Sequence, residues 1–264
     1  MLCELAVDNI GTYVDVITQI DAEQQYRMWF RGQSDYSWGL VPSVQRKDGM
    51  GKNYEQYIST NFMIHTMRLN PNAPQQYDRA SWLTLMQHYG LPTRLLDWSE
   101  SPLVALYFAL SGDEDAKTDA AVWMLNPMKL NKKVGYGEYV PPISYDSLRG
   151  DLEGAFSDHD NDDYELQNRI IACHGVGCDL RMYVQQSDFT IHSITERLDQ
   201  ILKLDEDRLV RNLEARESET FSYAADVNPE YNNEMEDPRI NVMDFVLNKE
   251  FLRKAMHSRA AVPL

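Results

Sequence analysis

The sequence has few cysteines, no long apolar segment and little positive charge. Three cysteines among 264 residues are too few for a disulfide framework and indicate reduced thiols. The longest apolar run, residues 103–110, is much shorter than the roughly 18–20 residues of a membrane helix. The first residues also lack the basic and apolar segments of a signal peptide. We therefore expect a cytoplasmic protein without a membrane partner.

The net charge of −16 is unevenly distributed along the chain. Residues 1–25 carry five acidic and no basic side chains, and residues 26–133 carry twelve basic and ten acidic ones. Residues 134–264 carry thirteen basic and twenty-six acidic side chains. Because nucleic-acid affinity depends largely on neutralising phosphates, the chain is a poor candidate for a general nucleic-acid binder. The near-neutral middle could hold one anionic ligand, and the acidic C-terminal half could bind an inhibitor or partner protein.

Apolar spacing and turn residues predict an α+β fold with a helical C-terminal part. The expected helices cover residues 10–20, 54–69, 79–89, 103–110, 195–204, 207–219 and 242–256. The expected strands cover residues 26–30, 93–98, 120–125, 181–185 and 188–192. Asp78 and Ser101 can cap helices, and Gly90 suits the left-handed position after a helix end.

The tripeptide Phe30-Arg31-Gly32 is the first candidate site. A guanidinium at the end of a strand, beside a residue that lets the backbone approach a ligand, suits a phosphate or carboxylate. The alternative is an arginine that fixes a loop by donating hydrogen bonds to carbonyl groups.

A second candidate site lies in residues 87–98, where polar and aromatic side chains are concentrated. The segment holds the titratable His88, Arg94, the carboxylate of Asp97, and the aromatic side chains of Tyr89 and Trp98. Arg94 and Asp97 could pair, and a half-buried pair of this kind usually organises a site or a loop. The alternative is a polar network that only fixes the chain between two helices.

These stretches resemble the FRG domain family, which is named for its (F/Y)RG motif. The likeness is carried by Phe30-Arg31-Gly32-Gln33, Trp38, Leu40, Pro42-Ser43, Arg46, Gln87-His88-Tyr89-Gly90-Leu91-Pro92-Thr93-Arg94-Leu95-Leu96-Asp97-Trp98, Ser101-Pro102, Ala105, Phe108-Ala109 and a third block from Arg181 to Phe189. In the third block, Ser187 replaces the glycine of the family. The resemblance implies an FRG domain over residues 1–192, followed by a helical extension over residues 193–264 that packs on or next to it.

A weaker resemblance is to the ADP-ribosyltransferases, whose NAD site lies in a split sheet flanked by helices. Residues 30–32 are similar to their first strand, residues 93–108 to their second piece, and residues 181–189 to their third. The resemblance implies a compact split sheet, mixed or antiparallel, with NAD as the substrate. The implied NAD-binding residues are Arg31, Gly32, Gln33, Tyr89, Thr93, Arg94, Trp98 and Arg181. The implied catalytic candidates are Arg31, His88, Asp97 and Gln185.

The third block departs from the transferase pattern at its catalytic position. It offers Gln185 and Gln186, and a glutamine can hold a hydroxyl group but cannot act as a general base. Either the activity is altered or lost, or a carboxylate comes from elsewhere. Asp97 is one candidate, and Glu217 with Glu219 is another, although helical spacing there favours a solvated helix end.

Residues 173–178, Cys-His-Gly-Val-Gly-Cys, offer three candidate zinc ligands. No second cluster of cysteine and histidine lies near enough in the sequence to complete a tetrahedral set. A glycine-containing loop with ordinary thiols is therefore the simpler interpretation.

Together these features predict a nucleotide-binding enzyme of ADP-ribosyltransferase type, a toxin or phage-defence effector acting on a protein or nucleic acid. An alternative of another class is a non-catalytic nucleotide-binding or sensing module, in which Arg31, Arg94 and Arg181 grip the ligand. A third hypothesis is a hydrolase that uses His88 and Asp97.

Overall fold

The computed structural model describes residues 2–7, 10–23, 27–46, 53–111, 118–156, 168–175, 187–201 and 242–247. In chain order the elements are β1 (Leu2–Val7), α1 (Ile10–Glu23), β2 (Trp29–Gln33), a 3-10 turn (Ser43–Gln45), α2 (Tyr54–Leu69), α3 (Arg79–His88), β3 (Leu95–Ser99), α4 (Pro102–Leu110), β4 (Ala120–Leu125), α5 (Pro127–Lys133), a second 3-10 turn (Asp146–Leu148), α6 (Arg149–Glu153), β5 (Ile170–His174), β6 (Ser187–His192) and β7 (Val242–Leu247). The predicted α+β class is confirmed.

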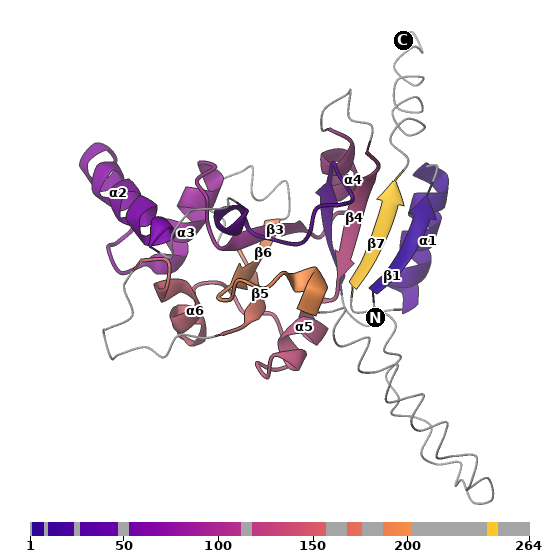
Figure 1. Ribbon diagram of the computed structural model, residues 1–264. Coiled ribbons are helices and arrows are strands. Elements are labelled where there is room, and N and C mark those ends of the chain that lie inside the picture. Colours follow the sequence, from indigo (N-terminus) through magenta and orange to yellow (C-terminus); the bar gives the residue numbers. More distant parts are fainter. Residues whose placement is uncertain are drawn as a thin grey trace, which may run out of the picture.

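One sheet of seven strands, in the order β1-β7-β4-β2-β3-β6-β5, runs through the molecule (Figure 1). Strand β1 is parallel to β7, and all other neighbours are antiparallel. Strands β2 and β3 are joined through a single residue pair, Phe30 with Ser99. By contrast, β2 pairs with β4 and β3 pairs with β6 along five residues each. The sheet therefore opens into two halves at the β2–β3 junction.

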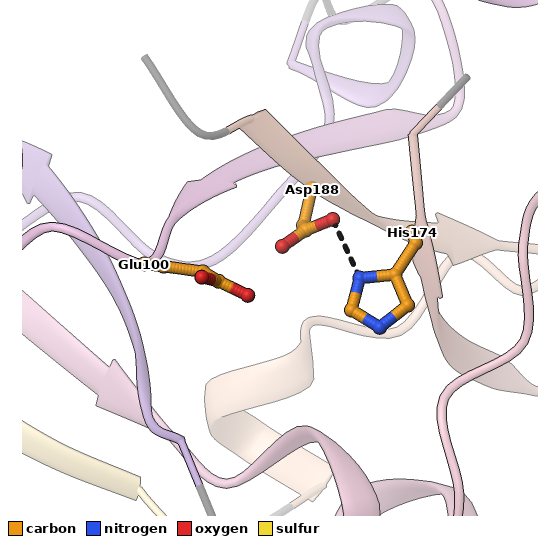
Figure 2. Close-up of side chains that lie close together, drawn as sticks. All are labelled: Glu100, His174 and Asp188. Carbon is orange, nitrogen blue, oxygen red and sulfur yellow. Dashed lines mark hydrogen bonds and ion pairs between the residues drawn. The ribbon is translucent and has the colours of Figure 1, made fainter. Parts of the chain in front are cut away.

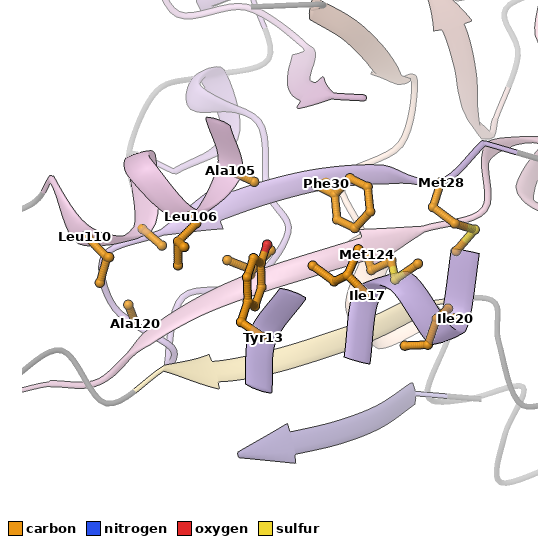
Figure 3. Packing of buried hydrophobic residues seen from close by; sticks show 12 residues of the cluster. Tyr13, Ile17, Ile20, Met28, Phe30, Ala105, Leu106, Leu110, Ala120 and Met124 are labelled. Atoms are coloured by element: carbon orange, nitrogen blue, oxygen red, sulfur yellow. The ribbon is translucent and has the colours of Figure 1, made fainter. Parts of the chain in front are cut away.

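Helices α1 and α4 cover one face of the β2–β4 half. Their apolar side chains form a buried core with Phe30, Val122 and Met124 of the two strands (Figure 3). Because successive side chains of a strand point to opposite faces, Trp29, Ala121 and Trp123 face the other way. These three residues belong to a second core, shared with Leu96 and Trp98 of β3.

Helices α3 and α6 cover the β3-β6-β5 half on the same side of the sheet as α4. Leu83 of α3 and Leu152 of α6 pack in a third core against Leu95, Phe189 and Ile171. The helices therefore stand as two groups above the two halves of the sheet, with the junction of β2 and β3 between them.

Local sequence signals set the helix ends that frame this junction. The side chain of Asp78 accepts a hydrogen bond from the Ser81 amide at 3.1 Å and starts α3. Ser101 accepts from the Val104 amide at 3.4 Å, with Pro102 in the first turn of α4. Gly90 has φ 73° after α3, in the left-handed region that glycine adopts without strain. The capping predictions are confirmed at all three positions.

Three strands differ from the sequence predictions. Residues 242–247, expected within a helix, form β7 between β1 and β4. The strands at Leu2–Val7 and Ile170–His174 were not expected. Short apolar runs fit helical and extended periods equally well, so their partners in the sheet decide the outcome. The strand expected at residues 181–185 and the helix expected at residues 207–219 lie outside the described residues.

Among the described residues, no helix has both the length and the apolar character needed to cross a membrane.

Replacing Gly32 by alanine should destabilise the fold. A Cβ atom at residue 32 would overlap the backbone carbonyl oxygen of Ala105 and would lie 2.6 Å from the Ala109 amide nitrogen, both on α4. Since backbone cannot swing aside, we expect a loss of about 2–3 kcal/mol in the free energy of unfolding, measured by denaturant titration. Gly90→Ala is the control: it meets no atom within 4 Å and should cost about 1–2 kcal/mol through its positive φ alone. Equal losses in the two variants would contradict the tight packing of α4 on β2.

Candidate functional site

A cleft of about 390 Å³ lies where β2 and β3 separate. This volume is within the range of small-molecule sites, about 300–1,000 Å³. Its walls come from β2, β3, the two helices on either side and the segment after β2. The lining residues are Phe30, Arg31, Gly32, Gln33, Ser34, Trp38, Arg46, Thr84, Gln87, His88, Asp97, Trp98, Ser99, Val104, Ala105, Phe108 and Phe189. The two stretches that the sequence singles out therefore meet at one cleft.

Arg31 bridges the gap between the two strands. Its Nη1 donates a hydrogen bond of 2.8 Å to the backbone carbonyl oxygen of Asp97 on β3. The Nε atom of Arg31 is buried and has no hydrogen-bond partner in the described part of the chain. Burial lowers the pKa of Arg31 to about 10, and the charge of Asp97 acts in the opposite direction. The guanidinium stays protonated at neutral pH and places a positive charge at the floor of the cleft.

Asp97 presents a carboxylate from the opposite wall. Its Oδ2 accepts a hydrogen bond of 2.6 Å from Nε2 of Gln87 on α3. Asp97 is exposed to solvent, but the solvent that it contacts lies inside a partly enclosed cleft. Withdrawal from bulk water raises the pKa of Asp97, while the charge of Arg31 and the hydrogen bond from Gln87 act to lower it. Gln87 and Arg31 thus hold an acidic group in a defined position.

Three further side chains at the cleft were not among the predicted site residues. Arg46 lines it and is anchored by a 2.8 Å hydrogen bond from its Nε to the Val41 carbonyl oxygen. Trp38 and Phe108 line it with 51% and 43% of their surface exposed. Trp38, Arg46 and Phe108 are all among the residues that carry the FRG resemblance, which is the signal that could have identified them.

Three predicted binding residues do not line the cleft. Thr93 is buried beneath it and donates to the side-chain oxygen of Gln87. Tyr89 lies on the surface with its ring 6.0 Å from that of Phe62. Arg94 points into the protein, where its Nη2 and Nε lie 2.8 Å and 3.1 Å from Oε2 of Glu55. The suggested pairing of Arg94 with Asp97 is therefore wrong, because the arginine belongs to a buried pair behind the strand.

Three other predicted residues line the cleft, two of them with side chains already engaged in the protein. Gln33 accepts a 2.7 Å hydrogen bond from Trp123 Nε1 and is buried. Trp98 is also buried and donates to Thr190 Oγ1 at 3.0 Å, so its ring is part of the core. His88 lines the cleft from the end of α3. Gln185 and Arg181 lie outside the described residues, as do Glu217 and Glu219.

A buried polar chain supports the floor of the cleft from below. Trp98 and His192 both contact the hydroxyl of Thr190, His192 through its Nε2 at 3.1 Å. The Nδ1 atom of His192 is buried without a hydrogen-bond partner in the described residues. Burial, together with the charge of Arg31, lowers the pKa of His192 to about 3. The imidazole is therefore neutral in the folded protein, and the positive charge of Arg31 helps to keep it unprotonated.

Arg94→Ala should lower the free energy of unfolding rather than change the cleft directly. Removing one partner of a buried ion pair leaves Glu55 charged and nearly inaccessible, which costs about 3–5 kcal/mol in the free energy of unfolding. The matched control is Arg27→Ala, because Arg27 pairs with Glu100 at 2.7 Å but has 78% of its side chain exposed. The control should cost less than about 1 kcal/mol. A loss for Arg94→Ala no larger than for Arg27→Ala, in denaturant titration, would refute the structural role.

The burial of His192 predicts an acid-sensitive contribution to stability. Unfolding returns its pKa from about 3 to about 6.5, so the unfolded chain binds the extra proton between these values. Stability from this residue is present above pH 6.5 and falls by up to about 1.4 kcal/mol per pH unit below it. We expect the difference in unfolding free energy between wild type and His192→Gln to shrink from pH 7 to pH 4.5. A difference that is independent of pH would contradict the buried neutral imidazole.

Comparison with known families places the cleft within a recognised domain. A family model described as FRG domain matches residues 26–118. The matched segment contains β2, α3, β3 and α4, which supply most of the cleft walls. Searches of curated proteins and of solved structures gave no match. The chain therefore contains an FRG domain, which spans residues 26–118.

Proposed function

We propose that the cleft binds a nucleotide and that NAD is its substrate in an ADP-ribosyltransferase-type reaction. The observation that carries the proposal is the meeting of Arg31, Arg46 and Trp38 at the split of the sheet. Two guanidinium groups suit a diphosphate, and an exposed aromatic ring suits a base. Motifs in the sequence, rather than any matching structure, connect this cleft with the transferases.

Charge and hydrogen bonding favour Arg31 and Arg46 as the diphosphate contacts. Guanidinium groups have five N–H donors in a fixed fork, and Arg31 uses one nitrogen, Nη1, on the Asp97 carbonyl oxygen. Arg46 is held by the Val41 carbonyl oxygen through Nε. Both arginines keep terminal nitrogens for an anionic ligand. Gly32 also lines the cleft, but its missing side chain makes room for the backbone of α4 rather than for a ligand.

Trp38 and Phe108 are the side chains suited to stack on the nicotinamide or adenine ring. Both line the cleft and are partly exposed, whereas the previously suggested Trp98 is buried. Stacking on a large rigid aromatic ring adds specificity at little cost in side-chain entropy.

Asp97 is the carboxylate that we assign to the chemical step. In that step the bond between ribose C1′ and the nicotinamide nitrogen breaks, and its electron pair leaves with nicotinamide. The Asp97 carboxylate stabilises the oxocarbenium-like centre and accepts the proton of the attacking acceptor or water. Gln87 positions the carboxylate through its 2.6 Å hydrogen bond. We assign the exchange of that proton with solvent to His88, which lines the same cleft.

The second candidate is a non-catalytic nucleotide-binding or sensing module that uses the same cleft. Gln185 and Gln186 stand where the transferases have their catalytic glutamate, and this observation favours binding without turnover. Only the transferase would need an acceptor protein or nucleic acid, and only the transferase would act as a toxin or defence effector.

Calorimetric titration with NAD and, separately, with ATP tests the binding proposal. We expect saturable heat with NAD at a dissociation constant on the order of 0.1 mM. Arg31→Ala and Arg46→Ala should each weaken binding about 10-fold or more, because a hydrogen bond to a charged group contributes about 1.5–3 kcal/mol. Arg68→Ala, on the exposed end of α2 away from the cleft, is the control and should bind NAD like the wild type.

Release of nicotinamide separates the two candidate functions. The enzyme should release it with NAD present, and Asp97→Asn should keep binding while slowing release by about 100-fold or more. NAD binding without nicotinamide release would instead support the sensing module. If neither NAD nor ATP gave heat at millimolar concentration, both candidate functions would be refuted.

A further inference from the structure

A histidine and two carboxylates meet on the face of the sheet opposite the cleft. Phe189 of β6 lines the cleft, so its neighbour Asp188 points to the other face, as alternate side chains of a strand do. Asp188 pairs across the sheet with His174 of β5 and with Trp98 of β3. Glu100 follows the last residue of β3 on the same side (Figure 2). None of these three residues takes part in the proposed nucleotide chemistry.

The geometry of this group is that of an incomplete coordination shell. One candidate ligand atom from each of the three side chains lies within 4.8 Å of the others. His174 Nδ1 is 2.9 Å from Asp188 Oδ1, and the Glu100 carboxylate faces both across a gap (Figure 2). Ligands of a bound ion lie about 3–3.5 Å apart when metal–ligand bonds are about 2.0–2.2 Å. Binding of an ion would therefore draw the Glu100 carboxylate closer to the other two ligands.

The burial of Asp188 supplies a second reason to expect a cation here. Only 6% of the residue is exposed, and its Oδ1 also accepts a 3.4 Å hydrogen bond from the Gly175 amide. The other oxygen points towards Glu100 (Figure 2) and accepts no hydrogen bond within the part of the chain that the structure describes. Two carboxylates that face each other at the edge of a core repel unless positive charge lies between them.

The charges that the structure places nearby compensate this repulsion only in part. Arg27 Nη1 lies 2.7 Å from Glu100 Oε2, but its side chain is 78% exposed, so the pair is a weak surface contact. It leaves the second oxygen of Glu100 available. His174, 2.9 Å from Asp188, compensates the repulsion only when the imidazole is protonated. A metal ligand is neutral, so binding of an ion would replace that proton as the source of positive charge.

We propose that Glu100, His174 and Asp188 bind a divalent transition-metal ion, with water completing its shell. One imidazole and two carboxylates suit Mn²⁺ or Zn²⁺, whereas Mg²⁺ prefers an all-oxygen shell. The hydrogen bond from Gly175 orients Asp188 as an outer-shell partner does at known metal sites. The ion would join the ends of β3, β5 and β6, on the half of the sheet that carries Asp97.

Titration of the chelator-treated full chain with MnCl₂, followed by calorimetry and by the electron paramagnetic resonance signal of free Mn²⁺, tests the proposal. Mn²⁺ is the first probe because thiolates bind it weakly. The three cysteines therefore do not add to the number of bound ions that the titration measures. We expect one saturable site, with ZnCl₂ competing and MgCl₂ binding at least 10-fold more weakly.

Variants of the three side chains and of their neighbours separate a metal site from a structural ion pair. Glu100→Gln, which keeps the size of the side chain, and His174→Ala should each weaken Mn²⁺ binding at least 10-fold. Arg27→Ala should leave binding intact or tighten it a few-fold, because Arg27 competes for Glu100. Glu138→Gln is the matched control, since Glu138 pairs with Lys132 at 3.2 Å elsewhere on the surface, and it should bind like the wild type.

The absence of saturable binding below about 1 mM in the wild type would overturn the proposal. Binding that is unchanged in both Glu100→Gln and His174→Ala would overturn it as well. Circular dichroism of each variant checks that it is folded, and Glu100→Gln keeps the test decisive if His174→Ala unfolds. Nucleotide binding at the cleft is not needed for any of these readouts.

Discussion

The separation of β2 from β3 is the constraint on which the rest of the structure depends. Strands that pair along their length leave no room for a ligand between them, but these two share only Phe30 with Ser99. Beyond that pair the backbone groups at the opening need other partners. Arg31 supplies one by donating to the Asp97 carbonyl oxygen. A structural hydrogen bond thereby places a guanidinium at the centre of the cleft, so the loop-fixing and ligand-binding interpretations of Arg31 are both compatible with its position.

Packing above and below the sheet keeps this opening in place. Helix α4 approaches β2 so closely that residue 32 must be glycine, and α3 holds Gln87 against Asp97 from the other side. On the opposite face, one core runs under both halves of the sheet and includes Trp29, Trp98 and Trp123. A rigid floor of large side chains and two separate helix groups above it make the cleft a property of the whole fold rather than of a loop.

Arg94 and Asp97 illustrate how close neighbours in a motif can have different tasks. Three residues apart on and just before a short strand, they point away from each other, one into a buried pair with Glu55 and one into the cleft. A similar division separates Phe189, at the cleft, from Asp188, in the group with His174 and Glu100. The alternation of side chains along β3 and β6 gives neighbouring residues places on opposite faces of the sheet.

Local patterns in the sequence determined the helices at Tyr54–Leu69, Arg79–His88 and Pro102–Leu110, because caps, glycine and proline act over a few residues. They also singled out the residues around Arg31 and Asp97, which meet at one cleft. Tertiary structure alone decided that Arg94 is structural and that His174 meets Asp188 and Glu100. It also brought Trp38 and Arg46, which the sequence marks only as motif residues, to the cleft. These outcomes depend on residues that lie 14 to 74 positions apart along the chain, as for His174 with its strand partner Asp188 and for Glu100 with His174. Local periodicity carries no information about such distant contacts.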